Sequence, residues 1–363
     1  MSKVRSRVLV AGLFCFFASY LQPRANAIVE PTPAKDTALP VPEIFAPGII
    51  SGPANDGSPT FSPDGGTLFF TRSSAHWSVI LESHRLKDRW SEPKVASFSG
   101  EWSDSSPAFS PDGSFIVFVS VRPLSTDSSQ AKGAPAMASH IWRVDRVGSG
   151  WSEPLQLPES INSFQWIFRP SVAADGSIYF TAAVKGKELS LFRSPCQHGI
   201  YRNVEALSFS DGSVKDVDPE IAPDQSFLVF TSKRPRPGDT THEHLFIVYN
   251  QGGVWGSIVP IRYAGDDANG SSEDNDPRFG ADHRTVYFSS DRTLAVHFPR
   301  THEQASEDYQ RLETWDNSNS NIWVISLSPV LKRRPPRSPG SEHSNWVPKA
   351  EGRHCWRPSF ASV

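Results

Sequence analysis

The sequence predicts an all-β fold in which five repeats each contribute four short strands. One motif, an early proline followed by a Ser-Pro-Asp-Gly turn or a variant of it, recurs five times between residues 56 and 283. The chain of 363 residues also holds 24 Gly and 31 Pro, which favours short strands joined by tight turns over long helices. Five repeats of four strands are typical of a β-propeller, and this is the fold that we predict.

Each repeat begins with a proline that lies five residues before the aspartate of a tight turn. These prolines are Pro59, Pro107, Pro170, Pro219 and Pro277. In the Pro-Asp-Gly turn, proline presets φ, aspartate bonds the backbone and glycine adopts positive φ. Gln225 and His283 replace this glycine in the last two repeats, so we expect those two turns to be strained or different.

We expect strand A before each turn and strand B after it. Strand B is predicted at Thr67–Thr71, Phe115–Ser120, Ser177–Thr181, Phe227–Ser232 and Thr285–Ser290. Strand C carries an apolar pair, at Val79-Ile80, Ile141-Trp142, Leu191-Phe192, Leu245-Phe246 and Ile322-Trp323. Strand D is short and is predicted at Val95–Phe98, Leu155–Leu157, Val204–Leu207 and Ile258–Ile261.

The fifth repeat has no strand D of its own. The apolar segment Glu43–Ile50 precedes the first repeat and can serve as the missing strand, which would close the ring and remove its open edge. The predicted propeller domain therefore spans residues 43–331. The alternative is a sixth, partial blade built on Trp356–Phe360.

These motifs resemble those of a known family. The Ser-Pro-Asp-Gly turns, the Asp-x-x-Pro openings and the turns Trp90–Pro93 and Trp151–Pro154 resemble the WD-repeat-like, TolB-type propellers of exported bacterial proteins. Phe45–Ser51 also resembles the opening of one branch of that family. The resemblance covers roughly residues 43–330 and implies the fold, together with a binding function like that of TolB. Strand C of that family usually opens with Asp, where this sequence has His140 and His244.

The two ends of the chain differ from its middle. Residues 1–27 have a basic start, an apolar stretch and the sequence Ala25-Asn26-Ala27, which is the pattern of a secretory signal. We therefore expect a periplasmic or secreted monomer without a membrane-spanning segment, with a Pro-rich linker at 28–42 and a basic, disordered tail at 332–363. The mature chain keeps Cys196 and Cys355, and the sequence leaves open whether they pair.

The charge of the middle excludes one class of partner. Residues 28–331 hold 25 basic and 37 acidic side chains, a net charge of −12. A body this acidic argues against nucleic acid, because phosphates require the opposite sign.

The candidate site lies on the face formed by the B–C and D–A loops. This face receives the long insertions Arg122–Ser139, Arg234–Glu243 and Asp291–Ser320, and Glu303–Glu313 in the last could form a short helix over the channel mouth. It also receives the repeat-opening acids Asp56, Asp104, Asp216 and Asp274 and the basic residues after strand B, namely Arg72, Arg122, Arg234, Arg292 and Lys185. The third repeat has Arg169 in place of the acid.

Two interpretations of these charges remain open. They could form a polar ring that binds a carboxylate- or hydroxyl-bearing ligand. They could instead pair with one another to fix blade against blade, and their recurrence in nearly every repeat favours this second interpretation.

Two other patterns suggest chemistry. His242-Glu-His244 beside Asp239 could present two imidazoles to a metal, but only two such ligands are local, and solvated histidines in a loop are the favoured interpretation. The acids Asp104, Asp216 and Asp274 could serve a glycan-active hydrolase or lyase, which needs two carboxylates close together. Because no asymmetric catalytic set is apparent, we expect a non-enzymatic module that binds a protein or cell-envelope polymer and needs no cofactor or metal.

Overall fold

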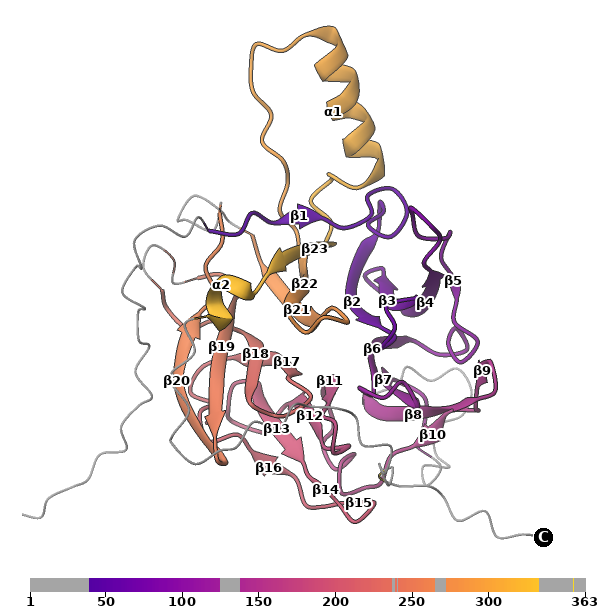
Figure 1. Cartoon of the computed structure of the whole chain (residues 1–363), viewed down its shortest axis with the longest axis vertical. Coiled ribbons are helices and arrows are strands. Elements are labelled where there is room, and N and C mark those ends of the chain that lie inside the picture. Colours follow the sequence, from indigo (N-terminus) through magenta and orange to yellow (C-terminus); the bar gives the residue numbers. More distant parts are fainter. Residues whose placement is uncertain are drawn as a thin grey trace, which may run out of the picture.

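The computed structural model describes residues 39–124, 138–236, 239, 241–264, 272–332 and 355. Its strands form five small antiparallel sheets arranged around one axis, so the predicted five-bladed β-propeller is confirmed (Figure 1). In every blade the four main strands follow the order A–B–C–D.

The strands lie close to their predicted positions. Blade 1 contains β2 (Asn55–Phe61), β3 (Thr67–Ser73), β4 (Ser78–His84) and β5 (Lys94–Val95). Blade 2 contains β6 (Asp104–Phe109), β7 (Phe115–Ser120), β8 (His140–Val147) and β10 (Leu155–Gln156), with β9 (Gly150–Trp151) beside β8. Blade 3 contains β11 (Ile167–Val172), β12 (Ile178–Ala182), β13 (Ser190–Ser194) and β16 (Glu205–Ala206), and the hairpin of β14 (Cys196–Gln197) and β15 (Ile200–Tyr201) follows β13. Blade 4 contains β17 (Asp216–Ile221), β18 (Phe227–Ser232), β19 (His244–Gln251) and β20 (Val254–Pro260). Blade 5 contains β21 (Asp274–Phe279), β22 (Thr285–Ser290), β23 (Asn321–Ser326) and β1 (Glu43–Ile44).

The A–B turns have the backbone that the motif predicts. The third turn residue has positive φ in all five repeats, including Gln225 at 57° and His283 at 50°, where the expected strain of a non-glycine residue is present. The side chain of Gln225 also forms hydrogen bonds that a glycine could not form. Its Nε2 donates to Asp175 Oδ2 at 2.8 Å and its Oε1 accepts from the Tyr179 hydroxyl at 2.8 Å, which ties blade 4 to blade 3.

The N-terminal segment closes the ring, but as a shorter strand than expected. β1 pairs with β23 through Glu43 and Ile44, and the Phe45 amide donates to the Ile322 carbonyl at 2.9 Å. The prediction that the strand continues to Ile50 is wrong, because the chain turns after Phe45, with positive φ at residue 46, and the Ile50 amide bonds back to the residue 46 carbonyl. Ile50 is nevertheless fully buried. Trp356–Phe360, on which the six-bladed alternative depends, lie outside the described residues.

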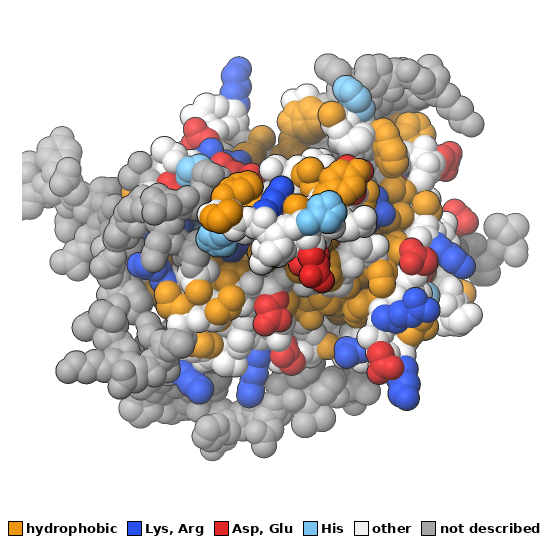
Figure 2. Space-filling view, turned by 90° about the horizontal axis from the view of Figure 1, so that it is seen from above, with side chains coloured by type: hydrophobic (Ala, Val, Ile, Leu, Met, Phe, Trp, Pro, Cys, Tyr) orange, Lys and Arg blue, Asp and Glu red, His pale blue; other side chains and the backbone are white. Residues whose placement is uncertain are grey.

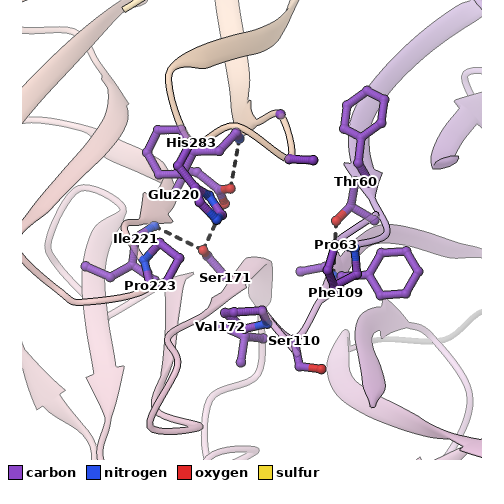
Figure 3. A pocket seen from close by; sticks show the side chains of 16 residues that line it. Thr60, Pro63, Phe109, Ser110, Ser171, Val172, Glu220, Ile221, Pro223 and His283 are labelled. Carbon is purple, nitrogen blue, oxygen red and sulfur yellow. Dashed lines mark hydrogen bonds between the residues drawn. The ribbon is translucent and has the colours of Figure 1, made fainter. Parts of the chain in front are cut away.

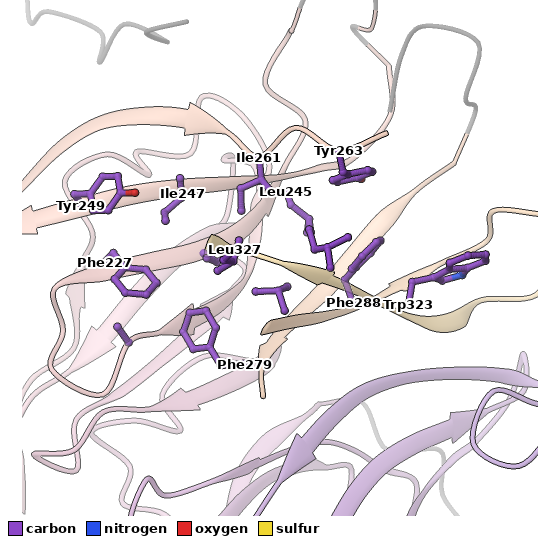
Figure 4. Packing of buried hydrophobic residues seen from close by; sticks show 14 of the residues in the cluster. Phe227, Leu245, Ile247, Tyr249, Ile261, Tyr263, Phe279, Phe288, Trp323 and Leu327 are labelled. Carbon is purple, nitrogen blue, oxygen red and sulfur yellow. The ribbon is translucent and has the colours of Figure 1, made fainter. Parts of the chain in front are cut away.

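The hydrophobic core is divided among the junctions between blades. Five clusters of buried side chains each join two neighbouring blades, and Figure 4 shows the cluster between blades 4 and 5. Aromatic residues after strand C add to these junctions, as where Trp151 of blade 2 contacts Phe69 and Phe98 of blade 1. Each buried side chain of this size contributes about 1.5–3 kcal/mol, so the junctions hold the ring together.

The insertion of blade 5 forms a helix, but not over the channel. Helix α1 (His302–Thr314) includes the predicted helical segment, and Figure 1 shows it extending outward from the ring. The expectation that it covers the channel mouth is wrong, because none of its residues is buried and its polar contacts lie within the insertion itself. Of the described helices, neither α1 nor α2 (Ser328–Leu331) has the length and apolar character needed to cross a membrane.

A disulfide joins blade 3 to the C-terminal region. Cys196 and Cys355 are bonded, with 5.9 Å between their Cα atoms, which settles the pairing that the sequence leaves open. Cys355 is 1% exposed, and its carbonyl accepts a hydrogen bond from buried Arg143 at 2.7 Å. The predicted signal and the rest of the predicted tail, apart from Lys332, lie outside the described residues, as does all of the linker before Leu39.

Candidate functional site

The repeat-opening acids pair with the arginines that follow strand B of the same blade. The contacts are Arg72–Asp56 at 2.7 Å, Arg122–Asp104 at 3.0 Å, Arg292–Asp274 at 2.7 Å, and a close Arg234–Asp216 pair. The four aspartate side chains are 0–1% exposed. The acids are therefore covered by the protein and are not available to a ligand in the channel.

The arginines also hold the loop that arrives from the preceding blade. Nη2 of Arg122 donates to the Phe98 carbonyl at 3.4 Å, and Nη2 of Arg234 donates to the Phe209 carbonyl at 2.9 Å. Burial raises the pKa of Asp216, although Arg234 opposes that rise. This geometry matches the second interpretation of the charges, in which the pairs fix blade against blade.

Arg169 does not belong to this set. In the strand register, Ile167 of blade 3 takes the position of the acid, opposite Ala182 as Asp216 is opposite Ser232. The assignment of Arg169 to the acid position is therefore wrong by two residues, because blade 3 has an apolar residue where the other blades have aspartate. Lys185, the basic candidate of blade 3, has an exposed side chain.

Arg169 instead belongs to a ring of bulged residues. In all five A strands the register shifts at the residue before the proline, and that residue has positive φ. A bulge of this kind redirects a side chain out of the regular alternation of a strand. The five bulged residues are Ser58, Ser106, Arg169, Asp218 and Asp276.

The bulged residues converge on the propeller axis. Nε of Arg169 lies 2.6 Å from Asp276 Oδ1 and 3.6 Å from Asp218 Oδ1. Its Nη1 donates to Ser106 Oγ at 3.0 Å and to Ser58 Oγ. One side chain can touch residues from the four other blades only at the centre of the ring, so Arg169 occupies the channel.

The channel carboxylates have an unusual electrostatic environment. Their side chains are 10% (Asp218) and 6% (Asp276) exposed, and the Asp276 amide donates to Asp218 Oδ2 at 3.2 Å. Burial, with the nearby charge of Asp276, raises the pKa of Asp218 to about 7, although Arg169 opposes this rise. Asp218 is therefore poised to change protonation near neutral pH.

A second layer of axial residues lies two positions further along the A strands. Glu220 Oε2 accepts from Ser171 Oγ at 2.8 Å and from Arg278 Nη1 at 3.0 Å, and its Oε1 accepts from the Phe279 amide at 2.9 Å. Arg278 also donates to the Pro170 carbonyl at 3.0 Å. This layer binds blades 3, 4 and 5 together and uses both oxygens of Glu220.

Beyond this layer a central pocket opens on the face of the A–B turns. Its volume is about 310 Å³, and Figure 3 shows side chains from several blades surrounding it. Phe61, Phe109 and Phe279 supply apolar lining, and Thr60 and Glu220 supply polar lining. The pocket lies on the opposite face from the one that the insertions suggest, because the bulged residues fill the channel on their side.

The His-Glu-His segment is a hydrogen-bonded cluster. His242 Nδ1 and His244 Nε2 each lie 2.9 Å from Asp239 Oδ2. The favoured interpretation of solvated histidines is wrong for His244, whose side chain is 3% exposed because it opens β19 beside Asp274. Among the described residues no group of three or more His, Cys, Asp or Glu side chains is placed to hold a metal ion.

Comparisons with known proteins give distant structural likenesses. No family model matches the sequence, and no curated protein matches it. TolB from Acinetobacter baumannii aligns at 14% identity and a TM-score of 0.42 over 75% of this chain and 55% of its own, so this chain spans about half of that protein. The putative TolB from Agrobacterium tumefaciens aligns at 15% identity and a TM-score of 0.42, over 76% of this chain and 91% of its own. The α-L-arabinofuranosidase PaAbf62A from Podospora anserina aligns at 10% identity and a TM-score of 0.44, over 80% of this chain and 96% of its own.

Sequence reasoning named Arg169 as a candidate but missed the other members of both axial layers, and it missed the pocket. The repeated proline is the signal that could have found the two axial layers, since the residues before and after it form these layers. Aligning the five prolines places Arg169 with Asp218 and Asp276, and it places Ser171 with Glu220 and Arg278.

Proposed function

We propose that this protein is an exported binding module for a protein or cell-envelope polymer, and that the ligand enters the central pocket on the A–B face. The observation that carries the proposal is the contrast between the channel and the pocket. The charged groups in the channel are paired with one another, whereas the pocket is open and joins aromatic walls to a few polar groups. Such a combination suits a segment that is held by shape and oriented by few hydrogen bonds.

The proposal can be tested by obstructing the pocket without disturbing the core. Ala281 lines the pocket at an exposed turn position, so Ala281→Trp should block the entrance while leaving the fold intact. The matched control is Lys87→Trp, an exposed residue in the turn after β4 at the edge of the same face. Envelope polysaccharides and periplasmic proteins would be screened by calorimetry. Binding that Ala281→Trp weakens at least tenfold and Lys87→Trp preserves would support the proposal, and binding that both variants preserve would refute the pocket as the site.

A glycan-active hydrolase or lyase is the second candidate. The raised pKa of Asp218, beside Asp276, is the observation in its favour, because a carboxylic acid that stays protonated near pH 7 can act as a general acid. It ranks second because Arg169 links both carboxylates. Turnover of polysaccharides or synthetic glycosides that Asp218→Asn abolishes would promote this candidate over the first.

A further inference from the structure

The insertion of blade 5 forms a hairpin whose helix buries none of its residues against the propeller. The hairpin comprises the irregular segment 293–300 and helix α1. A helix of 13 residues is marginally stable in water on its own. Here it is held by a capping box between Thr301 and Gln304 and by ion pairs within the hairpin.

An apolar groove runs between the two arms of this hairpin. Its volume is about 330 Å³, and its lining includes Leu294, Val296, Tyr309 and Leu312, which are 40–57% exposed. Phe298, at the tip, is 76% exposed. Figure 2, which looks onto the molecule from the side of α1, shows hydrophobic side chains at the surface among acidic, basic and histidine side chains. A concentration of exposed apolar groups on a projecting element is typical of a docking surface.

The charges of the hairpin indicate what kind of partner fits. Both of its arginines are paired, since Arg300 contacts Asp308 at 2.5 Å and Arg311 contacts Asp308 at 2.7 Å. The exposed acids Glu303, Glu307 and Glu313 have no ion-pair partner among the described residues. The groove therefore combines exposed apolar side chains with paired charges, and the exposed charges that lack an ion-pair partner among the described residues are negative.

These charges disfavour two of the possible occupants. A second copy would bring the same acids against this surface, and residues 28–331 of that copy carry a net charge of −12. An anionic lipid surface would also be repelled. We propose that the hairpin docks a basic protein segment, which inserts one or two large apolar side chains into the groove and places Lys or Arg beside the glutamates. This surface is separate from the central pocket, and the proposal does not depend on the ligand of that pocket.

Three fluorescent peptides of twelve residues test the chemistry. The first has a central Leu-Phe pair flanked by four lysines, the second replaces the pair with Ala-Ala, and the third keeps the pair but has four glutamates. Fluorescence anisotropy should show that the first binds the full chain at least tenfold more tightly than the other two. Its affinity should fall with added salt, because the glutamates contribute through screened charge. Equal binding of all three peptides would overturn the proposal.

Substitutions in the hairpin test whether the first peptide binds there. Leu312→Ser and Tyr309→Ser should each weaken the first peptide at least tenfold, with helix content by circular dichroism unchanged because both side chains are half exposed. The pair Glu303→Gln and Glu307→Gln should weaken it two- to fivefold and reduce the salt effect. Leu86→Ser, an exposed leucine on blade 1, is the control and should change nothing.

Three outcomes would overturn the assignment. The first is peptide binding that neither Leu312→Ser nor Tyr309→Ser affects. The second is a concentration-dependent dimer in analytical ultracentrifugation that Leu312→Ser abolishes, since it would identify a second copy as the occupant. The third is sedimentation with phosphatidylglycerol vesicles that depends on Leu312, since it would identify a membrane. The Ala281→Trp variant should bind the first peptide normally, so failure at the pocket and failure at the hairpin are distinguishable.

Discussion

Arg169→Ala should destabilise the fold, and the loss should depend on pH. Arg169 lies within 2.6–3.6 Å of two carboxylates whose side chains are 6% and 10% exposed. Removing one partner of a buried ion pair costs about 3–5 kcal/mol. Arg169 is itself 29% exposed, and solvent screens part of its charge, so we expect a loss of about 2–4 kcal/mol at pH 8. Urea unfolding followed by tryptophan fluorescence measures it.

The pH dependence follows from Asp218. Its pKa in the folded state, about 7, lies above the value of 3.8 for the free side chain. The contribution of this group to stability is therefore complete below pH 3.8, and it disappears as the pH rises through 7. At pH 5.5 Asp218 is mostly protonated, so Arg169→Ala leaves only Asp276 without a partner. The loss should then be smaller than at pH 8 by at least about 1 kcal/mol, since each unit of pKa shift corresponds to about 1.4 kcal/mol.

A double variant isolates the cause. In the background of Asp218→Asn, which removes one of the two negative charges, Arg169→Ala should cost less at pH 8 than it does alone. Arg169→Lys keeps the charge but not the hydrogen bonds to both serines, so the free energy of unfolding of this variant should lie between those of wild type and Arg169→Ala. The reasoning is refuted if Arg169→Ala lies within 0.5 kcal/mol of wild type, or if its cost is the same at both pH values and in both backgrounds.

Four further predictions concern the scaffold. In the Asp218→Asn variant, the free energy of unfolding should fall less between pH 5 and pH 8 than it does in wild type, as measured by urea unfolding at each pH. An equally steep fall in both proteins would contradict the raised pKa of Asp218. Arg122→Ala should cost about 2–4 kcal/mol because Asp104 is fully buried, and Arg72→Ala should cost less because Arg72 is 28% exposed; calorimetric melts check this order. Deleting residues 28–45 removes β1 and should lower the melting temperature sharply or cause aggregation, whereas an unchanged melt would refute closure by this segment. Cys355→Ser should cost roughly 3–5 kcal/mol by the chain-entropy account of a long loop, and denaturation with and without reductant should show that wild type, but not the variant, responds.

The sequence predicts the parts of this fold that repeat. Turn chemistry and apolar runs place β7, β18 and β22 at their observed bounds, because the same local interactions act in every blade. The pairs of Arg122 with Asp104 and Arg292 with Asp274 are also predictable, since the strand geometry that places one pair places the others.

The features that sequence reasoning missed depend on irregular strand pairing or on contacts between blades. The position of Arg169 follows from a bulge, which shifts the register by a residue and leaves no mark in the apolar pattern. The burial of His244 depends on nearby Asp239 and on Asp274, which opens the next blade. The pocket is formed by several blades at once, so no single repeat contains its signal.

The five bulged residues on the axis differ from blade to blade, and electrostatic repulsion explains this difference without reference to function. Five copies of one side chain cannot meet on the axis if that side chain is charged, because five like charges would repel one another in a space largely closed to water. One arginine between two aspartates and two serines reduces this repulsion, and Glu220 with Arg278 forms a second mixed pair one layer further along. The mixture of charges at the axis therefore has an electrostatic explanation and does not by itself indicate catalysis. The apolar side chains of the blade 5 hairpin, by contrast, stay exposed at a cost to stability, and aromatic side chains line the central pocket, and this is why we propose recognition at these two places.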